Sequence, residues 1–213
     1  MGFLVDLHLH TNRYSRCSRI YPGDVIPRAV RAGLDGAVIT EHHHQWEADE
    51  LKQLVDRSGH PTFLLLSAFE YTSSQGDILI YGLEPKRALE FRPGWPPERA
   101  ADLAVRYGGV CIAAHPTRAG MGFDQRIASL PLAAIEVCSV NLEDHERRLA
   151  RKLAESLSLQ QVANSDAHDA DDIGRYATEF DDLITSMEDL QAALSRGRFH
   201  VARSHEQVRK SGP

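Results

Sequence analysis

Two histidines near the N-terminus carry the first sign of chemistry in this sequence. His8 and His10 flank Leu9 in a segment where apolar and polar residues alternate. Because successive side chains of a β-strand point to opposite faces, both imidazoles project from the same face. Two imidazoles side by side at the end of a strand form half of a metal site. The same spacing also occurs in strands that bind no metal. Donor residues elsewhere in the chain are therefore needed to distinguish a metal site from two ordinary histidines.

Other nitrogen and carboxylate donors follow short apolar segments that are typical of buried strands. These further candidate ligands are His42, Glu70, His115, Asp166 and His168. In a parallel α/β barrel the C-terminal ends of all strands meet at one rim, so residues far apart in the sequence would converge there. This mixture of donors suits Zn, Mn or Fe, and it exceeds what one tetrahedral ion needs. We therefore predict two or three divalent ions, which can activate a water and hold both ends of a phosphoryl displacement.

The elements that must position these side chains alternate between strand and helix roughly seven times. The pattern predicts strands over residues 3–9, 37–40, 63–69, 78–81, 110–114, 135–137, 161–163 and 177–180, and helices over 24–32, 46–57, 98–107, 142–157 and 186–194. A proline-rich segment, 84–97, is expected to be a long excursion. Such alternation favours a parallel α/β arrangement, either a barrel or a doubly wound sheet. A glycine-rich phosphate loop is absent, which weighs against a nucleotide-binding sheet.

Composition narrows the class of protein. The chain has 213 residues, of which 42% are hydrophobic and 25% charged, as in an ordinary globular domain. A net charge of -6 leaves no basic excess for the phosphates of long nucleic acid, so we expect no such partner. Three cysteines without a CxxC pair, no signal peptide and no membrane-length apolar run predict a cytoplasmic protein that does not bind membranes. One domain is expected over residues 1–200, with a polar tail over 201–213.

The order of the motifs resembles that of the PHP (polymerase and histidinol phosphatase) family. The matching segments are Asp6-Leu7-His8-Leu9-His10-Thr11, Ile39-Thr40-Glu41-His42, Glu70, Ala114-His115-Pro116 and Ser165-Asp166-Ala167-His168. Ile135-Glu136-Val137 with Asn141, and Gly76-Asp77-Ile78-Leu79, also resemble the small stand-alone members. The resemblance implies a distorted seven-stranded (β/α) barrel in a single domain, with up to three metal ions. It further implies a metal-dependent phosphoesterase that acts on a small phosphorylated metabolite or nucleotide.

The family pattern also implies a role for each candidate ligand. His8 and His10 would hold the first ion together with Asp166. Glu70 would bridge the first and second ions, and His115 would bind the second. His42 and His168 would hold a third ion. A metal-activated water would attack phosphorus, and the ions would stabilise the charge that develops on the phosphoryl oxygens.

Three departures from the family pattern leave alternatives open. Where a first-loop Asp or His is common, this chain has Ser15, Arg16 and Cys17, of which Cys17 is either a thiolate ligand or an idle cysteine. Glu41 replaces a commoner Asp, and we place it with the catalytic residues as the group that orients a ligand. A further ligand between His115 and Asp166 would have to be Cys138 or His145, and each of these also suits packing or the surface.

Two arginines are candidates for gripping a substrate phosphate. Arg16 lies in the first loop, and Arg118 follows His115 on the same predicted rim, where it could also act in catalysis. Each is equally consistent with a solvated loop arginine. His43 and His44 are expected to face solvent. Two other functions remain: a hydrolase of C–N bonds of the amidohydrolase kind with the same metals, and a metal-binding regulatory module without catalysis.

Overall fold

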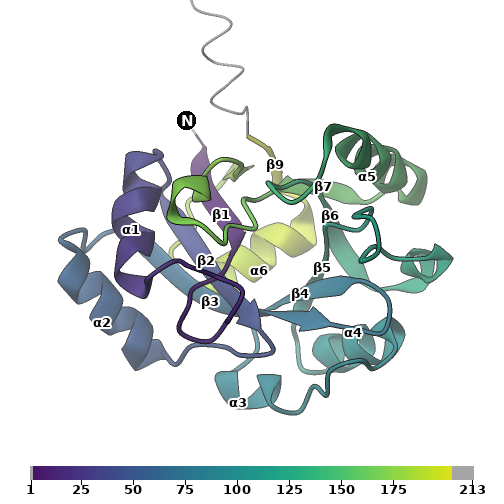
Figure 1. Cartoon of the computed structure of the whole chain (residues 1–213), viewed down its shortest axis with the longest axis horizontal. Coiled ribbons are helices and arrows are strands. Elements are labelled where there is room, and N and C mark those ends of the chain that lie inside the picture. Colours follow the sequence, from purple (N-terminus) through teal and green to yellow (C-terminus); the bar gives the residue numbers. More distant parts are fainter. Residues whose placement is uncertain (1, 203–213) are drawn as a thin grey trace, which may run out of the picture.

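A curved sheet of nine strands organises the computed structural model, which describes residues 2–202 (Figure 1). The strands are β1 (Phe3–Leu9), β2 (Gly36–His42), β3 (Leu64–Thr72), β4 (Asp77–Tyr81), β5 (Val110–Ala114), β6 (Leu132–Cys138), β7 (Gln160–Ala163), β8 (Thr178–Phe180) and β9 (Phe199–Val201). Their order in the sheet is β7-β6-β5-β4-β3-β2-β1-β8-β9. β1, β2 and β3 pair in parallel, as do β5, β6 and β7. β4 is antiparallel to both of its neighbours, so the two parallel groups point the same way.

The sheet closes almost completely into a barrel. At the C-terminal end of β1, Leu9 forms a parallel bridge with Ala167, the continuation of the chain beyond β7. The amide of Asp166 donates to the carbonyl of His8 at 2.7 Å, and the amide of His10 donates to the carbonyl of Ala167 at 3.0 Å. The other end of β1 pairs instead with β8, through Phe3, Leu4 and Val5. The expected α/β barrel is therefore confirmed, with nine strands in the described part in place of the seven that the resemblance implies.

Helices cover the outside of this barrel and one of its ends. They are α1 (Pro22–Arg31), α2 (Ala48–Ser58), α3 (Pro85–Ala88), α4 (Pro97–Arg106), α5 (Asp144–Leu157) and α6 (Met187–Arg196). Their ends follow from the sequence, since Glu143 and Glu146 form a capping box at the start of α5 and Gly197 ends α6 in the left-handed conformation. α6 lies across the opening of the barrel in Figure 1. No helix within residues 2–202 has the length and hydropathy needed to cross a membrane.

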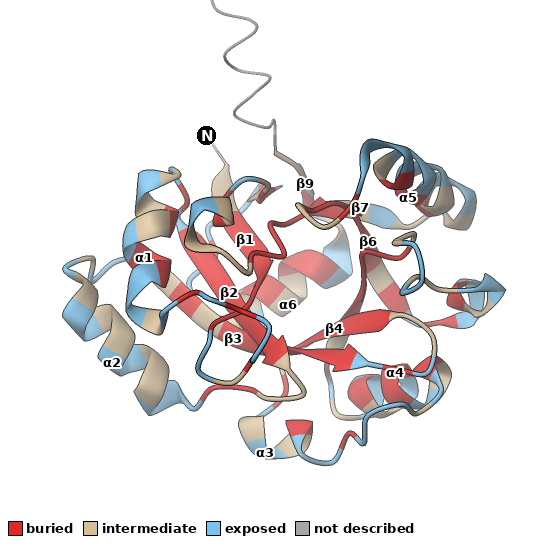
Figure 2. Ribbon diagram, viewed as in Figure 1, coloured by how far each residue is buried: buried red, intermediate tan, exposed pale blue. Residues whose placement is uncertain are grey.

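Burial concentrates in the strands, as the red ribbons of Figure 2 show. Alternate residues of β2, β3 and β5 face opposite sides, so Val38, Ala68 and Ile112 join one apolar cluster with Leu190 of α6. Residues of the other parity pack in two further clusters against the outer helices. The described chain thus has a barrel interior and two outer layers, and polar groups enter the interior at the end opposite α6.

The sequence-based boundaries differ from the structure mainly at the C-terminus. Val201, which the sequence places in a polar tail, ends β9, because Phe199 is buried against Phe180 of β8. Residues 203–213 of the expected tail lie outside the described residues. The expected excursion over 84–97 contains the single turn of α3 and leads directly into α4.

Candidate metal centre

All seven predicted ligands come together at the rim formed by the C-terminal ends of the parallel strands. They are His8 in β1, His10 just beyond it, His42 at the end of β2, Glu70 in β3, His115 just after β5, and Asp166 and His168 after β7. The strand parity that buries Ala68 also turns Glu70 into the barrel. His115 does not follow the parity of Ile112 and Ala114, because it lies beyond the end of β5 with a φ of 28°. Residues spread along most of the chain therefore share one mouth.

The inner part of this centre is fully buried. Nε2 of His8 lies 3.1 Å from Nε2 of His10. Oε2 of Glu70 is 3.5 Å from the first of these nitrogens and 3.2 Å from the second. Oδ1 of Asp166 lies 3.3 Å from Nε2 of His8 and 3.4 Å from Nε2 of His10. Two imidazole nitrogens and two carboxylate oxygens thus converge on one point, which is the arrangement of a divalent cation site.

The outer part of the centre is reached by solvent. Nδ1 of His42 lies 3.0 Å from Oε2 of Glu70 without the alignment of a hydrogen bond, and its side chain is 34% exposed. Donor atoms of His10, His42 and His168 all lie within 4.8 Å of one another. Three converging imidazoles that make no hydrogen bonds with each other are explained if they share a cation. The residues present therefore fit the divalent ions that the sequence predicts.

Burial and charge together set the protonation of the centre. Burial alone would lower the pKa of His8, but the carboxylates of Asp166, Glu136 and Glu70 raise this pKa well above its usual value. In the same way, burial would lower the pKa of His115, but Glu70 raises this pKa to about 9. Burial alone would raise the pKa of Asp166, yet the neighbouring imidazoles hold this pKa well below its usual range. In the absence of cations Glu70 and Asp166 are thus ionised while His8, His10 and His115 retain protons, positive charge that bound cations would replace.

Glu136 in β6 supports two of the ligands from behind. Its Oε1 accepts from Nδ1 of His8 at 3.0 Å and from Nδ2 of Asn164 at 3.0 Å, and its Oε2 accepts from the amide of His115 at 2.8 Å. A proton held on Nδ1 leaves the lone pair of His8 on Nε2, the atom that faces the centre. The sequence motif Ile135-Glu136-Val137 includes Glu136 but does not predict its role, which only the structure shows.

The segment that carries Asp166 is held by side chains as well as by its backbone hydrogen bonds to β1. Asn141 donates to Oδ2 of Asp166 at 2.7 Å, and Asp6 accepts from the amides of Ser165 and Gly174 at 2.9 and 3.2 Å. Asp166, His115 and His43 all have positive φ, of 51°, 28° and 54°. For residues other than glycine this backbone is strained, and such strain concentrates at functional sites.

Asp77 joins the centre although the sequence reasoning did not select it as a ligand. Its Oδ2 lies 3.9 Å from Nε2 of His115, and Glu70, Asp77 and His115 form a further buried group of donor atoms. Burial raises the pKa of Asp77 to about 6. A search of strand C-termini misses this residue because β4 runs antiparallel and brings its first residue, not its last, to the rim. The only signal was the Gly76-Asp77 pair before the strand.

Glu41 faces away from the centre. It lies in β2 with the parity of Ala37 and Ile39, which pack on the outer side of the sheet. Its carboxylate accepts from the amide and hydroxyl of Thr11 and from Nε1 of Trp46, the last at 3.0 Å. These contacts fix the turn that follows His10, so Glu41 acts on the ligands through Thr11 and does not touch the mouth.

The remaining candidates divide between the rim and the surface. Arg118 is half-buried beside the centre, whereas Arg16 is exposed. Cys17 is exposed and belongs to no group of donor atoms in the described chain. Cys138 is buried with its Sγ 2.9 Å from Nη2 of Arg151, and exposed His145 pairs with Glu143 at 3.2 Å.

His43 is half-buried, and its Nδ1 makes no hydrogen bond within residues 2–202. Ser15, in the loop where a family ligand is common, places its hydroxyl 3.4 Å from Nδ1 of His10.

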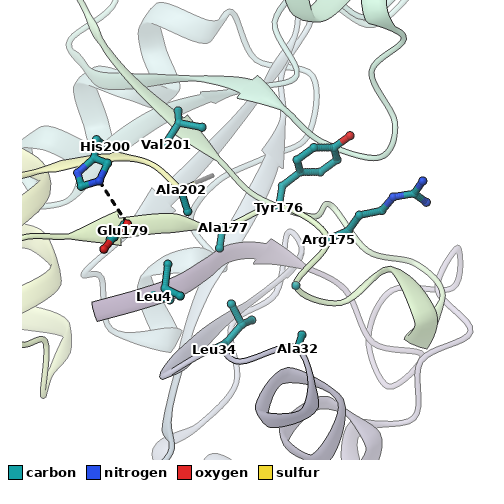
Figure 3. A pocket seen from close by; sticks show the side chains of 11 residues that line it. Leu4, Ala32, Leu34, Arg175, Tyr176, Ala177, Glu179, His200, Val201 and Ala202 are labelled. Carbon is teal, nitrogen blue, oxygen red and sulfur yellow. Dashed lines mark ion pairs between the residues drawn. The ribbon is translucent and has the colours of Figure 1, made fainter. Parts of the chain in front are cut away.

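A separate cavity lies away from the centre. It has a volume of about 370 Å³ and is lined by Leu4 at the start of β1, by Leu34 and by Ala177 (Figure 3). Glu179 and His200 pair at its edge at 3.3 Å. The cavity contains none of the predicted site residues, because it lies at the end of β1 opposite His8 and His10.

Comparison with known proteins bears on both the fold and the family. A family model described as PHP-associated matches residues 144–199. The crystal structure of PsfC from Pseudomonas syringae is 22% identical with a TM-score of 0.73, and the match covers 98% of this chain and 95% of that one. A two-domain protein from Bacteroides vulgatus containing a predicted PHP-like metal-dependent phosphoesterase is 19% identical with a TM-score of 0.71, covering 96% and 65% of the two chains. None of the curated proteins matches this chain.

A third solved structure corrects one expectation from the sequence. Endonuclease Q in complex with a 27-mer duplex substrate, with an abasic lesion at the active site, is 15% identical with a TM-score of 0.67, covering 94% of this chain and 58% of that one. The expectation that long nucleic acid is excluded was wrong, because a protein of this fold holds duplex DNA at its active site. A net charge of -6 averages the whole surface, whereas a substrate contacts only the mouth.

Proposed function

We propose that this chain is a metal-dependent hydrolase of phosphate esters with a PHP domain. Its motif order, its fold and the family-model match support the PHP domain. The observation that carries this proposal is the convergence of His8, His10, Glu70 and Asp166 on one point, with His42, His115, Asp77 and His168 around it. A small phosphorylated metabolite or a nucleotide is the substrate we would test first, and polynucleotides belong in the same panel.

Divalent ions at this centre would supply a water of lowered pKa and positive charge for the phosphoryl oxygens. The chain itself supplies the geometry. Glu136 keeps the proton of His8 on Nδ1, Asn141 fixes the orientation of Asp166, and Glu70 is placed between His10 on one side and His115 on the other. Arg118 on the rim could bind a phosphate oxygen, since a guanidinium is well matched to a tetrahedral anion. The preorganised donors thus hold the reacting groups without rearrangement.

Metal analysis and an activity panel test this proposal together. The purified chain would be loaded with Mn²⁺, Zn²⁺ or Fe²⁺ and incubated with phosphomonoesters, nucleotides and oligonucleotides. We expect tight binding of more than one ion and hydrolysis of at least one phosphate ester. His10→Ala should abolish both, while His145→Ala, an exposed histidine that pairs with Glu143, should change neither.

Two results would overturn the proposal. Loaded protein that hydrolyses amides while every phosphate ester stays intact would support the C–N hydrolase in its place. Stoichiometric metal binding without turnover of any ester or amide would support the regulatory module. The cytoplasmic location and the identity of the native metal stay predictions that this experiment does not address.

A further inference from the structure

A groove of about 540 Å³ opens directly beside the metal centre. One wall is the turn 72–77 that joins β3 to β4, and the other is the loop 117–123 that follows His115. Asp77 belongs both to this groove and to the group of donor atoms that it forms with Glu70 and His115. An ester whose phosphate sits at the centre would therefore place its leaving group in the groove.

The groove is formed before any ligand arrives, because its second wall is tied at several points. The amide of Phe123 donates to the carbonyl of Pro116 at 2.9 Å, which closes the loop on itself. Glu146 of α5 accepts from the amide of Ala119 at 2.6 Å, and its carbonyl accepts from the hydroxyl of Thr117 at 2.8 Å. The loop is thus anchored to the helix behind it, which lowers the entropy that a ligand would have to overcome.

The side chains in the groove combine a flat apolar surface with free polar groups. The ring of Phe123 rests on Gly76 so closely that a Cβ at that glycine would lie 2.4 Å from the ring, and the phenyl group is only half-buried. Within residues 2–202, the side-chain amide of Gln75 and the guanidinium of Arg118 make no hydrogen bond or ion pair, although the backbone amide of Gln75 donates to Oγ of Ser73 and Arg118 acts electrostatically on Glu146. An aromatic ring beside an unpaired amide suits a flat heterocycle with polar edges, as a nucleobase has.

We infer that this groove is the subsite for the nucleoside part of a nucleotide, with the base against Phe123 and its edge on Gln75. The inference rests on the proposed function, which places the phosphate at the metal centre. A sugar phosphate without a base would leave the apolar surface uncovered, and a lipid would leave Gln75 and Arg118 without partners. The nucleotide could be free or stand at the end of a strand, since both present the same base and phosphate.

The test compares matched esters on the metal-loaded full chain. The probes are AMP, ribose 5-phosphate and a 5′-phosphorylated tetranucleotide. We expect the kcat/KM for AMP or for the tetranucleotide to exceed that for ribose 5-phosphate about tenfold, which is a typical effect of stacking one base. Which of the two is preferred identifies the free nucleotide or the strand end as the source.

Variants assign this preference to the groove. Phe123→Leu keeps an apolar contact with Gly76 but removes the flat ring, and Gln75→Ala removes the amide. Both substitutions should bring the ratio of kcat/KM between the nucleotide and ribose 5-phosphate towards one, mainly by raising the KM for the nucleotide. Thermal melts would show that each variant keeps its fold. Arg126→Ala, in the neighbouring η1 turn (Gln125–Ser129) and paired with Asp124, should leave the ratio unchanged. A wild-type ratio near one, or a ratio that Phe123→Leu does not alter, would overturn the nucleoside subsite. Either result would leave the proposed phosphoesterase function unaffected.

A second readout does not depend on turnover. Adenosine carries no phosphate ester, and its binding can be followed by saturation-transfer NMR. We expect a transfer signal that Phe123→Leu weakens and Arg126→Ala does not. If the loaded chain hydrolysed no ester at all, the proposed function would fail, and this signal would still report on the groove. An adenosine signal that is absent from the wild type would overturn the subsite.

Discussion

Nδ1 of His8 lies 3.0 Å from Oε1 of Glu136, and this contact joins the first strand of the barrel to the sixth across its interior. The same carboxylate holds the amide of His115 through its other oxygen. One buried group therefore orients two predicted ligands that are far apart in the sequence. This relationship makes Glu136 the most informative position behind the centre.

Glu136→Gln should weaken metal binding while the fold is kept. The amide of a glutamine has one acceptor oxygen, so its NH2 group must face His8, Asn164 or the amide of His115, each of which donates at present. Loss of such a supporting partner typically costs about 10- to 100-fold in metal affinity. The affinity can be measured by competition with a chelator, with Glu143→Gln at the exposed start of α5 as the control. Unchanged affinity would contradict the role assigned to Glu136.

The metal-free protein should lose stability as the pH rises from about 6.5 to 9. His115 has a pKa raised to about 9, and the pKa values of His8 and His10 are also raised, because nearby carboxylates outweigh burial. A histidine whose pKa is higher in the folded state stabilises fully below its unfolded pKa, and this contribution disappears as pH passes the folded pKa. Calorimetry of the chelator-treated chain across this range measures the fall in Tm.

Metal binding should stabilise the protein more strongly as the pH rises over the same range. Protons compete with cations for the imidazoles, so ions bind more tightly as these groups lose their protons. The difference in Tm between loaded and metal-free chain should therefore grow from pH 6.5 to 9. A difference that stays constant over this interval would show that the imidazoles do not exchange protons for ions.

Asp77→Asn should lower the number of bound ions without abolishing binding. The carboxylate of Asp77 belongs to one group of donor atoms with Glu70 and His115, whereas His8, His10 and Glu70 form another group without it. We therefore expect the ion at the inner point to remain and the one beside His115 to be lost. Elemental analysis after dialysis measures this, and Asp124→Asn, an exposed acid paired with Arg126, is the matched control. Full metal content in Asp77→Asn would remove this residue from the ligand set.

Trp46→Phe should reduce stability more than it affects the metal centre. The substitution removes the Nε1–H that donates to Glu41 and leaves a fully buried carboxylate with fewer partners. Thr11 still donates to both carboxylate oxygens, so the expected cost is that of one hydrogen bond to a charged group, about 1.5–3 kcal/mol of the free energy of unfolding. Urea denaturation measures this cost, and Trp95→Phe, whose indole ring is stacked by Arg99, is the control. A larger effect on metal content than on stability would mean that Glu41 contacts the ions directly.

The sequence predicted the convergence of several donors where one rule applied. His42, His115 and Asp166 each follow a strand of the parallel set, so the common rim of an α/β barrel was enough to bring them together. Asp77 was missed as a candidate because an antiparallel strand reverses this rule. The outward position of Glu41 could have been predicted from its parity with Ile39, but the motif suggested a role in catalysis. The groove could not be predicted, since its shape depends on the packing of Phe123 on Gly76, which no sequence pattern indicates.

The hydrogen bonds from Asp166 to His8 and from His10 to Ala167 have a consequence for biosynthesis. His8 and His10 leave the ribosome long before Asp166 and Ala167 are synthesised. A nascent chain therefore has no inner cation site until the segment after β7 has emerged and docked beside β1. Metal acquisition should therefore be a late event in the life of each molecule, and truncated translation products should retain no ion at this point.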